Sequence, residues 1–247
     1  MKTSLEGKRC LVTGGSRNLG RAISLALGRA GARVAFTYKE RDEEAAETTR
    51  LLREMGVEPV VVKGAVFDAK HVASTIKAVE TGFGGIDILI NNAGMTQIMP
   101  IALIDEDEWD AVMDTNVKGA YLFSRAALRS MIRSKKGHIL NIGSFGADRV
   151  VDAPVHYAAS KAALVGFSLA LAKEVGRYGI AVNCLVPGLL ETGLSNRLPR
   201  HRVDSYVAQA ALGRLGTIEE VAEFAAWIVS DENSFMTGGQ VVIDGGL

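Results

Sequence analysis

Residues 11–20 read LVTGGSRNLG, an apolar run followed by a glycine-rich turn and the start of a helix-like pattern. Such a turn between a strand and a helix is where dinucleotides bind, because N–H groups at the helix start face the pyrophosphate. Gly14 permits the tight turn, and Gly20 permits close packing of helix on strand. Asn18 stands where many such loops have glycine, but Asn tolerates a left-handed backbone better than other non-glycine residues. By itself the loop favours phosphate binding only modestly, since similar turns also have purely structural roles.

Apolar runs recur along the chain and alternate with helix-like patterns. The runs are rich in Val, Ile and Leu with little polar alternation, which is typical of parallel strands buried on both faces. The expected strands are 10–14, 33–37, 59–63, 86–91, 138–143, 181–186 and 240–244. Helices are expected between them, for example over 20–32, 43–56 and 219–230. This alternation predicts one doubly wound α/β domain over 1–247, with a seven-stranded parallel sheet and helices on both faces in three α/β/α layers.

Composition narrows the class of protein. Lys plus Arg and Asp plus Glu both number 28 in the 247 residues, so the chain lacks the basic excess expected for non-specific nucleic-acid binding. No apolar run looks long enough for a membrane span, and the first residues lack a signal region, so we expect a cytoplasmic location. Cys10 and Cys184 lie in apolar runs and are expected to be buried thiols. The four histidines are scattered, so no metal site is expected.

The stretch YAASK places Tyr157 and Lys161 one helical turn apart, on one face of a helix-like run. An ammonium about 4 Å from a phenol is worth about 4 kcal/mol at an effective dielectric near 20. That interaction would lower the tyrosine pKa from about 10 toward about 7. Such a tyrosine can give a proton to a carbonyl oxygen or take one from an alcohol. A solvated pair on a surface helix is the alternative interpretation.

Three further polar positions follow expected strands or lie in a helical region. Ser144 comes just after HILNIG, where its hydroxyl could bond the same carbonyl oxygen. Asn116, in DTNVKGAY, could order a water in a proton relay. The NNAG stretch, 91–94, offers amides for a cofactor ribose. Each alone could be a turn hydroxyl, a cap or an ordinary helix residue; together at strand ends they indicate a site.

In this order, these residues resemble the classical short-chain dehydrogenase/reductase family, and the resemblance covers nearly the whole chain. The matching positions are Thr13, Gly14, Gly20, 91–94, Asn116, Ser144, Tyr157, Lys161, Pro187, Gly188 and 237–246. The resemblance implies a Rossmann sheet and a catalytic tetrad. Tyr157 would be the general acid/base and Ser144 would hold the carbonyl, whereas Lys161 would bind the nicotinamide ribose and Asn116 the relay water.

The resemblance also implies a set of cofactor-binding residues. They are Gly14, Ser16, Arg17, Asn18, Leu19, Gly20, Tyr38, Lys39, Asn92, Ala93, Gly94, Tyr157, Lys161, Pro187, Gly188 and Thr192. The chain departs from the family after the third strand, where an adenine-contacting aspartate is common. Ala65 stands there, with Asp68 three residues later.

The end of the second expected strand bears on the choice of nicotinamide. NAD-preferring relatives carry an acid there, whereas this chain has Tyr38 followed by Lys39. Together with Arg17, Lys39 would attract a 2′-phosphate, which favours NADP(H). Glu40 and Asp42 lie close by in the sequence, so NAD(H) is kept as the alternative.

Within the family, the chain most resembles the 3-oxoacyl-[acyl-carrier-protein] reductases. The implied reaction is NADPH-dependent reduction of a β-keto thioester, in fatty-acid or polyketide-type biosynthesis. A dehydrogenase of a free alcohol or ketone, such as a sugar, steroid or secondary metabolite, is the alternative. A third alternative is a regulatory protein that senses the dinucleotide, against which Tyr157 and Lys161 together argue.

A lid segment and clusters of basic residues are expected to bind a carrier-bound substrate. A substrate lid is expected over 189–211, where Arg197, Arg200 and Arg202 would face an anionic tether. A second basic rim is expected from Lys135, Lys136, Lys173 and Arg177, although solvated helix faces would explain these charges equally well. The apolar stretch 95–104 either lines the substrate pocket or packs in the core. The family resemblance implies a homotetramer.

Overall fold

The fold is built on a seven-stranded, entirely parallel sheet. The computed structural model describes residues 3–147, 149, 151–193 and 195–247. The strand order is β3-β2-β1-β4-β5-β6-β7. The strands are β1 (Arg9–Thr13), β2 (Arg33–Tyr38), β3 (Val60–Lys63), β4 (Ile88–Asn91), β5 (Gly137–Ile142), β6 (Ile180–Pro187) and β7 (Gln240–Ile243). Each expected strand is therefore confirmed, with small differences only at the ends, and the doubly wound fold is confirmed with them.

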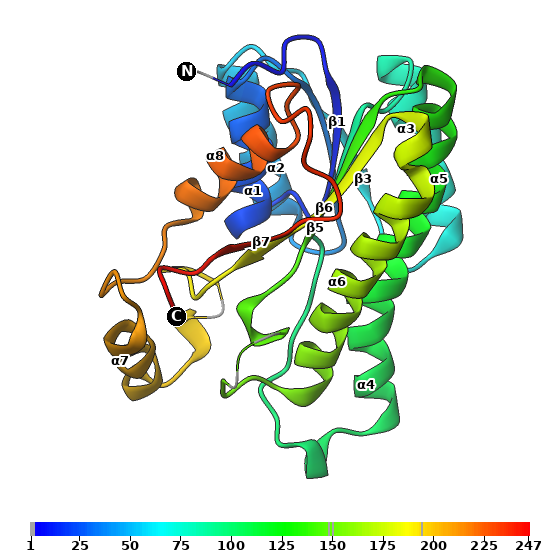
Figure 1. The fold of residues 1–247 in the computed structure, drawn as a ribbon. Coiled ribbons are helices and arrows are strands. Elements are labelled where there is room, and N and C mark those ends of the chain that lie inside the picture. Colours follow the sequence, from blue (N-terminus) through cyan, green and yellow to red (C-terminus); the bar gives the residue numbers. More distant parts are fainter. Residues whose placement is uncertain (1–2, 148, 150, 194) are drawn as a thin grey trace.

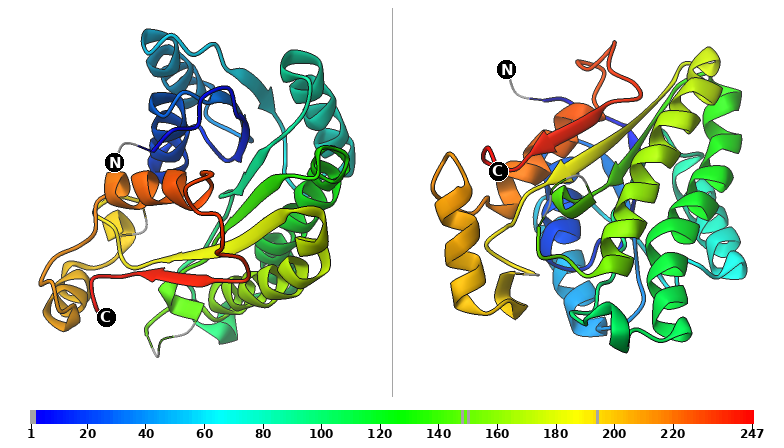
Figure 2. Two further views of the ribbon diagram at one scale, coloured as in Figure 1. Left: turned by 45° about the horizontal axis from the view of Figure 1, so that its top comes forward. Right: turned by 60° about the horizontal axis from the view of Figure 1, so that its bottom comes forward.

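Helices cover both faces of the sheet in three layers (Figure 1, Figure 2). One hydrophobic cluster joins the sheet to α1 (Asn18–Arg29), α2 (Asp42–Glu54) and α8 (Ile218–Ile228). The other joins it to α3 (Ala69–Phe83), α5 (Gly119–Ser134) and α6 (Val155–Val175). The strand residues alternate between the two clusters, with Cys10 and Val12 in the first and Leu11 in the second. This burial on both faces explains why the strands read as continuous apolar runs.

Shorter elements surround the carboxyl edge of the sheet. They are η1 (Ile101–Leu103), α4 (Glu106–Met113), the π-helical η2 (Asp114–Lys118), η3 (Phe145–Ala147), η5 (Ser195–Arg197) and α7 (Arg200–Gln209). A further turn, η4 (Gly176–Tyr178), ends α6 at the opposite edge. From β1 the chain continues to β2 and β3 on one side of β1, and then crosses to β4 on the other side. The strand order therefore reverses between β1 and β4. Ligands bind at this kind of switch point, outside the carboxyl ends of the strands.

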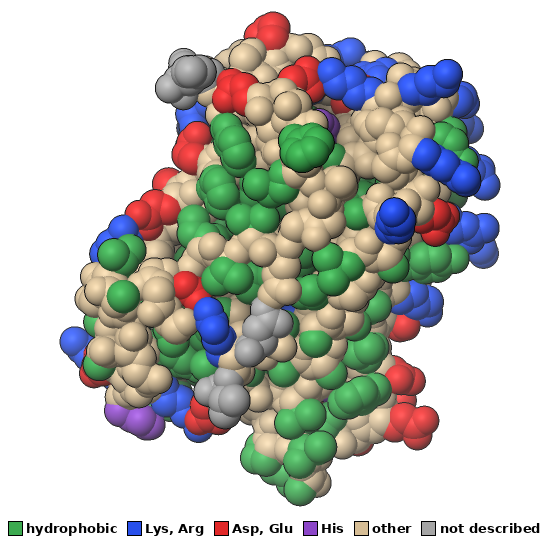
Figure 3. Space-filling model, viewed as in Figure 1, with side chains coloured by type: hydrophobic (Ala, Val, Ile, Leu, Met, Phe, Trp, Pro, Cys, Tyr) green, Lys and Arg blue, Asp and Glu red, His purple; other side chains and the backbone are tan. Residues whose placement is uncertain are grey.

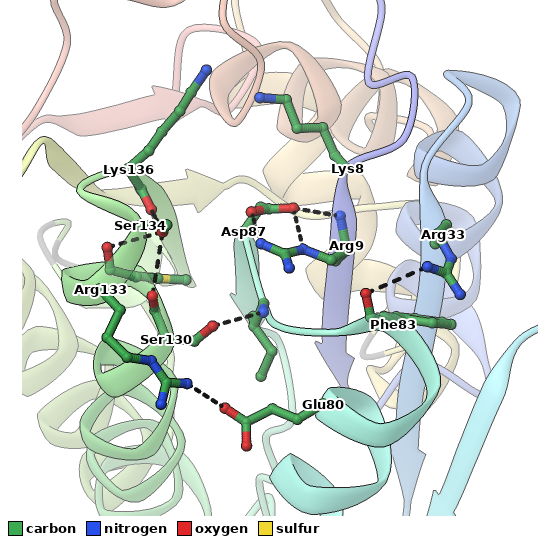
Figure 4. A network of polar contacts seen from close by, with 12 residues as sticks. Lys8, Arg9, Arg33, Glu80, Phe83, Asp87, Ser130, Arg133, Ser134 and Lys136 are labelled. Atoms are coloured by element: carbon green, nitrogen blue, oxygen red, sulfur yellow. Dashed lines mark hydrogen bonds and ion pairs between the residues drawn. The ribbon is translucent and has the colours of Figure 1, made fainter.

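Ionic and backbone contacts hold the amino edge of the sheet together (Figure 4). Arg9 at the start of β1 donates to Asp87 just before β4 through Nε at 2.8 Å and Nη2 at 2.5 Å. The Arg9 backbone N–H bonds the same carboxylate at 2.9 Å. Arg33 on β2 donates to the carbonyl of Gly82 at 2.7 Å at the end of α3. These contacts leave the opposite, carboxyl edge available for a binding site.

The helix α6 is unusually long and apolar. The stretch Val155–Tyr178 is long and apolar enough to cross a membrane by length and composition, with a mean hydropathy of 1.3. The expectation that no run reaches this length is therefore wrong by that measure. However, Lys161 and Ser168 are buried and bond groups on or next to β5: Lys161 donates to the Ile142 carbonyl, and Ser168 accepts from the Asn141 side-chain amide. The helix thus packs against the sheet as a core helix.

Both cysteines are buried, and neither forms a disulfide, as expected. Burial raises the pKa of the Cys10 thiol far above its ordinary value. Cys10 lies within β1 and Cys184 within β6, so both thiols are part of the packed core.

Candidate active site

The glycine-rich loop between β1 and α1 has the backbone that its sequence predicts. Gly14 has φ +65°, and a Cβ added to Gly20 would lie 2.1 Å from the Gly14 carbonyl oxygen. Asn18, the first residue of α1, has φ +46°. The expectation that Asn18 takes a left-handed backbone in place of glycine is thus confirmed.

Residues just after β4 form hydrogen bonds with this loop. The Thr13 hydroxyl accepts from the backbone N–H groups of Asn92 and Ala93, both at 3.1 Å. The Asn92 side-chain amide donates to the carbonyls of Thr13 and Gly14, both at 3.0 Å. Both N–H groups of that amide are therefore used by the loop, so Asn92 shapes the turn and leaves only its oxygen for a ligand.

A cavity of about 410 Å³ opens in front of the loop at the switch point. Many expected cofactor-binding residues line it: Gly14, Ser16, Arg17, Asn18, Leu19, Gly20, Tyr38, Lys39, Asn92, Ala93 and Gly94. It is also lined by residues that sequence reasoning missed: Thr37, Glu40, Arg41, Gly64, Val66, Phe67, Met95 and Thr115. Tyr157, Lys161, Pro187, Gly188 and Thr192, which were expected to contact the cofactor, do not line this cavity.

The rim of the cavity beyond β2 carries excess positive charge. Lys39 pairs with Glu40 at 3.3 Å. Arg17 and Arg41 are exposed, and no ion pair with either is found in the described part of the chain. Arg41 was missed because it lies in the acidic stretch KERDEE, but its φ of +67° marks the turn into α2.

The wall after β3 has no carboxylate aimed at the cavity. Gly64, Val66 and Phe67 line it. Asp68 instead caps α3, accepting a bond from the Lys70 N–H at 2.8 Å. The replacement of an aspartate by Ala65 therefore leaves a largely apolar wall there, suited to the flat face of an adenine ring.

Tyr157, Ser144 and Lys161 come together beside the end of this cavity. Tyr157 lies half-buried in the first turn of α6, and its hydroxyl is close enough to the buried Ser144 for that side chain to lower its pKa. Lys161 is 4% exposed, and its Nζ donates to the Ile142 carbonyl at 2.7 Å. Nζ lies 5.7 Å from the centroid of the Tyr157 ring.

The electrostatics differ from the sequence-based expectation. Burial raises the pKa of Tyr157, and the bond to Ser144 offsets this only in part. Burial lowers the pKa of Lys161 to about 8. The prediction that Lys161 brings the Tyr157 pKa down toward 7 is wrong for this arrangement, because the ammonium bonds the Ile142 carbonyl and burial disfavours the charged phenolate.

Asn116 lies in the π-helical turn η2 and is buried. Its Oδ1 accepts from the Met95 N–H at 2.8 Å, and its Nδ2 donates to the Met95 carbonyl at 3.0 Å and to Ser160 Oγ at 2.8 Å. Ser160 in turn donates to the Tyr157 carbonyl at 2.7 Å. The Asn116 amide thus links the cavity wall to the turn of α6 that carries Tyr157. A π-helical turn of this kind is frequent at functional sites.

Gly94 joins the cavity to the tetrad. A Cβ at this position would lie 3.3 Å from Asn116 Oδ1 and 3.4 Å from Lys161 Nζ. The polar groups of Asn116 and Lys161 therefore lie next to the cavity wall at this glycine, with no side chain between them and the wall. All four expected catalytic residues lie together at the carboxyl edge.

The segment after β6 folds back toward the glycine-rich loop. Gly188 lies very close to the backbone just after β7, since an added Cβ would lie 2.7 Å from Asp244 Cα. Gly188 also lines a separate cavity of about 240 Å³. A Cβ on Gly193 would lie 3.8 Å from Asn18 Nδ2. Thr192 Oγ1 is buried and has no hydrogen-bond partner among the described residues, which fits a hydroxyl that bonds a ligand.

The rest of the expected lid, 189–211, stands beside the carboxyl edge (Figure 1). Leu194, within this range, lies outside the described residues. The Tyr206 ring packs edge-on against Phe145 at 5.6 Å, and Arg202 pairs with Asp152 at 3.0 Å. The segment therefore rests on the loop that follows Ser144.

The second basic rim is at the wrong edge of the sheet. Lys135 and Lys136 precede β5, and Lys173 and Arg177 lie at the far end of α6 from Tyr157. Lys136 is paired there with Asp231 at 2.8 Å. These four cations cannot meet a substrate at Tyr157, because strand direction places them at the amino edge. Among the residues described, no group of His, Cys, Asp and Glu side chains has the arrangement of a metal site.

Known proteins resemble this chain over nearly its full length. Residues 14–247 match a family model described as enoyl-(acyl carrier protein) reductase. The 3-oxoacyl-[acyl-carrier-protein] reductase of Pseudomonas aeruginosa is 39% identical over 246 residues, which cover 99% of this chain and 98% of that protein.

Solved structures agree with this similarity. A short-chain dehydrogenase from Burkholderia cenocepacia in complex with NADP has a TM-score of 0.91 and 36% identity, with 98% of each chain covered. A gluconate 5-dehydrogenase from the same organism, in complex with NADP and tartrate, has a TM-score of 0.93 and 31% identity, covering 100% of this chain and 97% of the other.

Proposed function

This chain belongs to the short-chain dehydrogenase/reductase family and is an oxidoreductase acting on CH–OH groups, and we propose that it reduces 3-oxoacyl thioesters to 3-hydroxyacyl thioesters with NADPH. The observation that carries the proposal is that Gly94 lines the cleft and lies beside Asn116 and Lys161, two members of the group of Asn116, Ser144, Tyr157 and Lys161. The 39% identity to a 3-oxoacyl-[acyl-carrier-protein] reductase supports the substrate class.

The residues of the cavity fit a nicotinamide dinucleotide. The N–H groups at the start of α1 and the close approach at Gly14 and Gly20 suit a pyrophosphate. The apolar wall of Val66 and Phe67 suits the adenine. The unpartnered Thr192 hydroxyl and the buried Lys161 ammonium suit the nicotinamide end. Pro187 and Gly188 would act there by placing the Thr192 segment.

The reduction follows from the tetrad's own chemistry. When bound, a reduced nicotinamide would supply the hydride for the carbonyl carbon. Tyr157 gives its phenolic proton to the carbonyl oxygen, so that C=O becomes CH–OH, and Ser144 hydrogen-bonds the same oxygen. The Lys161 ammonium offsets the negative charge left on Tyr157 until solvent returns the proton. Asn116 holds Tyr157's turn of α6 through Ser160. A relay water beside Asn116 is part of the proposal.

The preference for NADPH rests on the rim beyond β2. Arg17 and Arg41 flank the cavity there without ion-pair partners in the described ranges, and Lys39 lies between β2 and Arg41. Guanidinium groups match a phosphate in geometry and charge, so they favour a 2′-phosphate over a 2′-hydroxyl. Solved relatives with NADP bound support this assignment.

A carrier-bound substrate would enter beside the lid. Arg197 and Arg200 lie on η5 and α7 at the carboxyl edge, where they can meet an anionic tether. Met95 lines the cavity, whereas Ile101 and Leu103 of the same apolar stretch are exposed. Hydrophobic side chains gather at the lower tip of the molecule (Figure 3). An acyl chain leaving the tetrad would therefore find an apolar path along 95–104.

Reduction of a free ketone, or oxidation of a free alcohol, is the second candidate. The likeness to a gluconate 5-dehydrogenase, whose structure holds NADP and tartrate, favours it. A sensor without turnover would have no use for Tyr157 beside Ser144 and a buried lysine. Fatty-acid or polyketide biosynthesis is the proposed setting, with a cytoplasmic homotetramer as the proposed assembly.

The decisive measurement is the loss of reduced nicotinamide absorbance when the purified protein meets acetoacetyl-CoA, with NADPH and NADH run in parallel. Rapid oxidation of NADPH, and slow oxidation of NADH, is the expected result. Turnover of gluconate-type alcohols or free ketones, with none of the thioester, would replace the first candidate with the second.

A further inference from the structure

Beside the 2′ rim of the cavity, three side chains form a cluster that the proposed reaction does not use. Tyr38 ends β2 and Lys63 ends β3, and the two residues are register partners in the sheet. Lys63 Nζ bonds both carboxylate oxygens of Asp42 at 2.8 Å. The Tyr38 hydroxyl donates to Asp42 Oδ1, also at 2.8 Å. Tyr38, Asp42 and Lys63 are called the Asp42 cluster below.

The cluster lies directly behind the wall where a dinucleotide's adenosine would sit. Tyr38, Arg41 and Gly64 all line the cavity, whereas Asp42 does not. Asp42 is the first residue of α2, and the left-handed backbone of Arg41 marks the turn that leads into it. Asp42 is thus within reach of the rim, but its carboxylate bonds Lys63 and Tyr38.

Three of the four acids in residues 40–44 are offset by a cation, whereas the exposed Glu43 has no ion pair among the described residues. Glu40 pairs with Lys39, Asp42 with Lys63, and Glu44 with Arg21. Arg17 and Arg41 keep their charges unpaired within the described segments. The bonds from Lys63 and Tyr38 also lower the pKa of Asp42, so its carboxylate stays ionised, and the bond to Asp42 raises the pKa of Lys63. The sign of the charge presented to a ribose therefore depends on Lys63 as well as on the arginines.

We propose that Lys63 is a specificity-determining residue, which acts through Asp42 to favour a dinucleotide with a 2′-phosphate over one with a 2′-hydroxyl. Lys63 offsets the Asp42 charge and holds its carboxylate away from the ribose. Without the ammonium, Asp42 would repel a 2′-phosphate and would be available to accept from ribose hydroxyls, the role of the acid in NAD-binding sites. This inference rests on the proposed function in one respect, that the cavity binds a nicotinamide dinucleotide.

The test compares dissociation constants for NADPH and NADH, measured by titration calorimetry on the full-length protein without substrate. Lys63→Met should lower the preference for NADPH roughly two- to fivefold, the effect expected of one exposed ion pair. Lys63→Arg keeps the charge and should keep the wild-type ratio. Lys77→Met, at an exposed lysine on α3, is the matched control and should leave both constants unchanged.

The double variant Lys63→Met with Asp42→Asn separates an effect through Asp42 from a direct effect of the lysine. Its ratio should return to within about twofold of that of Asp42→Asn alone. A Lys63→Met protein with the wild-type ratio, or a double variant as impaired as Lys63→Met, would overturn this inference while leaving the proposed function standing. A wild-type protein that binds NADH at least as tightly as NADPH would overturn both.

Discussion

At the scale of single residues, the site depends on a few polar groups whose pKa values are shifted in opposite directions by burial. Burial pushes the Tyr157 pKa up and the Lys161 pKa down, so both groups are driven toward their neutral forms. A neutral phenol is the form that can donate a proton to a carbonyl. The pair is therefore set for reduction near neutral pH, where Lys161 still carries its charge.

Tyr157→Phe removes the transferable proton and keeps the ring. We expect a loss of roughly 10²–10⁴-fold in kcat, the range of general acid catalysis, with the dissociation constant for NADPH little changed. Stopped-flow turnover and calorimetric titration of the same sample would check this. Turnover close to that of the wild type would contradict the role given to Tyr157.

The pH dependence of reduction should report Lys161. Its pKa is lowered to about 8 by burial, so the ammonium is charged below that pH and neutral above it. We expect kcat/KM to be level on the acid side and to fall above pH 8, since the neutral amine cannot offset charge on Tyr157. Circular dichroism at each pH serves as the control for unfolding. A profile that stays flat to pH 10 would show that the lysine charge is not needed.

The two unpaired arginines of the rim should contribute to the choice of dinucleotide. Arg17→Ala combined with Arg41→Ala should raise KM for NADPH about tenfold or more and change KM for NADH little, because each arginine supplies a charge-assisted bond to phosphate. Arg125→Ala, on α5 away from the cavity, is a suitable control. Equal losses with both dinucleotides would place the arginines at the pyrophosphate instead.

At the scale of elements, two irregular segments position the chemistry. The π-helical η2 turns Asn116 toward Met95 and Ser160, and the segment after β6 brings Gly193, the neighbour of Thr192, close to the Asn18 side chain. Regular helices and strands set the distances of the fold, whereas these segments set the contacts of the site.

The packing of α7 on the loop after Ser144 gives a prediction for the lid. Tyr206→Ala removes the ring that contacts Phe145, so we expect KM for acetoacetyl-CoA to rise several-fold, with the NADPH dissociation constant unchanged. Tyr206→Phe keeps the ring contact and should behave as the wild type. Phe235→Ala, at a fully exposed side chain outside the lid, controls for a general loss of aromatic surface. An unchanged KM in Tyr206→Ala would argue against a substrate lid.

At the scale of the whole molecule, ion pairs and hydrogen bonds link the elements at the amino edge of the sheet (Figure 4). Apolar clusters cover its two faces. Burial alone would raise the pKa of Asp87, but the bonds to Arg9 together lower it by more than burial raises it. The net pKa therefore lies below the ordinary 3.8. A carboxylate with a depressed pKa stabilises the fold above the unfolded value, and this stabilisation is lost as the pH falls through the folded value.

Asp87→Asn tests that contribution. At pH 7 we expect a decrease of about 1–3 kcal/mol in the free energy of unfolding, since Arg9 loses a charged partner in a part-buried place. Near pH 3 the difference from the wild type should shrink, because the wild-type carboxylate is then being protonated. Urea titrations at both pH values would measure this. Glu80→Gln, which affects the exposed pair with Arg133, should cost less than about 1 kcal/mol.

The elements and the tetrad could be predicted from the sequence because their signals are local. Buried parallel strands read as apolar runs, as in β5 and β6, and Tyr157 and Lys161 lie on one helix face whatever surrounds them. The left-handed backbone of Asn18 was expected from its place in the glycine-rich loop and from the tolerance of Asn for this conformation.

What only the tertiary structure decided depends on which strand ends are neighbours and on what is desolvated. Gly64, Val66 and Phe67 line the cavity, and Lys63 reaches Asp42, because β3 lies beside β2. Lys135 and Lys136 looked suited to a substrate rim, but strand direction places them at the opposite edge. The pKa of Tyr157 rises rather than falls because it depends on burial, which no spacing along the chain reveals. Local stereochemistry is encoded residue by residue, whereas electrostatic environment is a property of the packed whole.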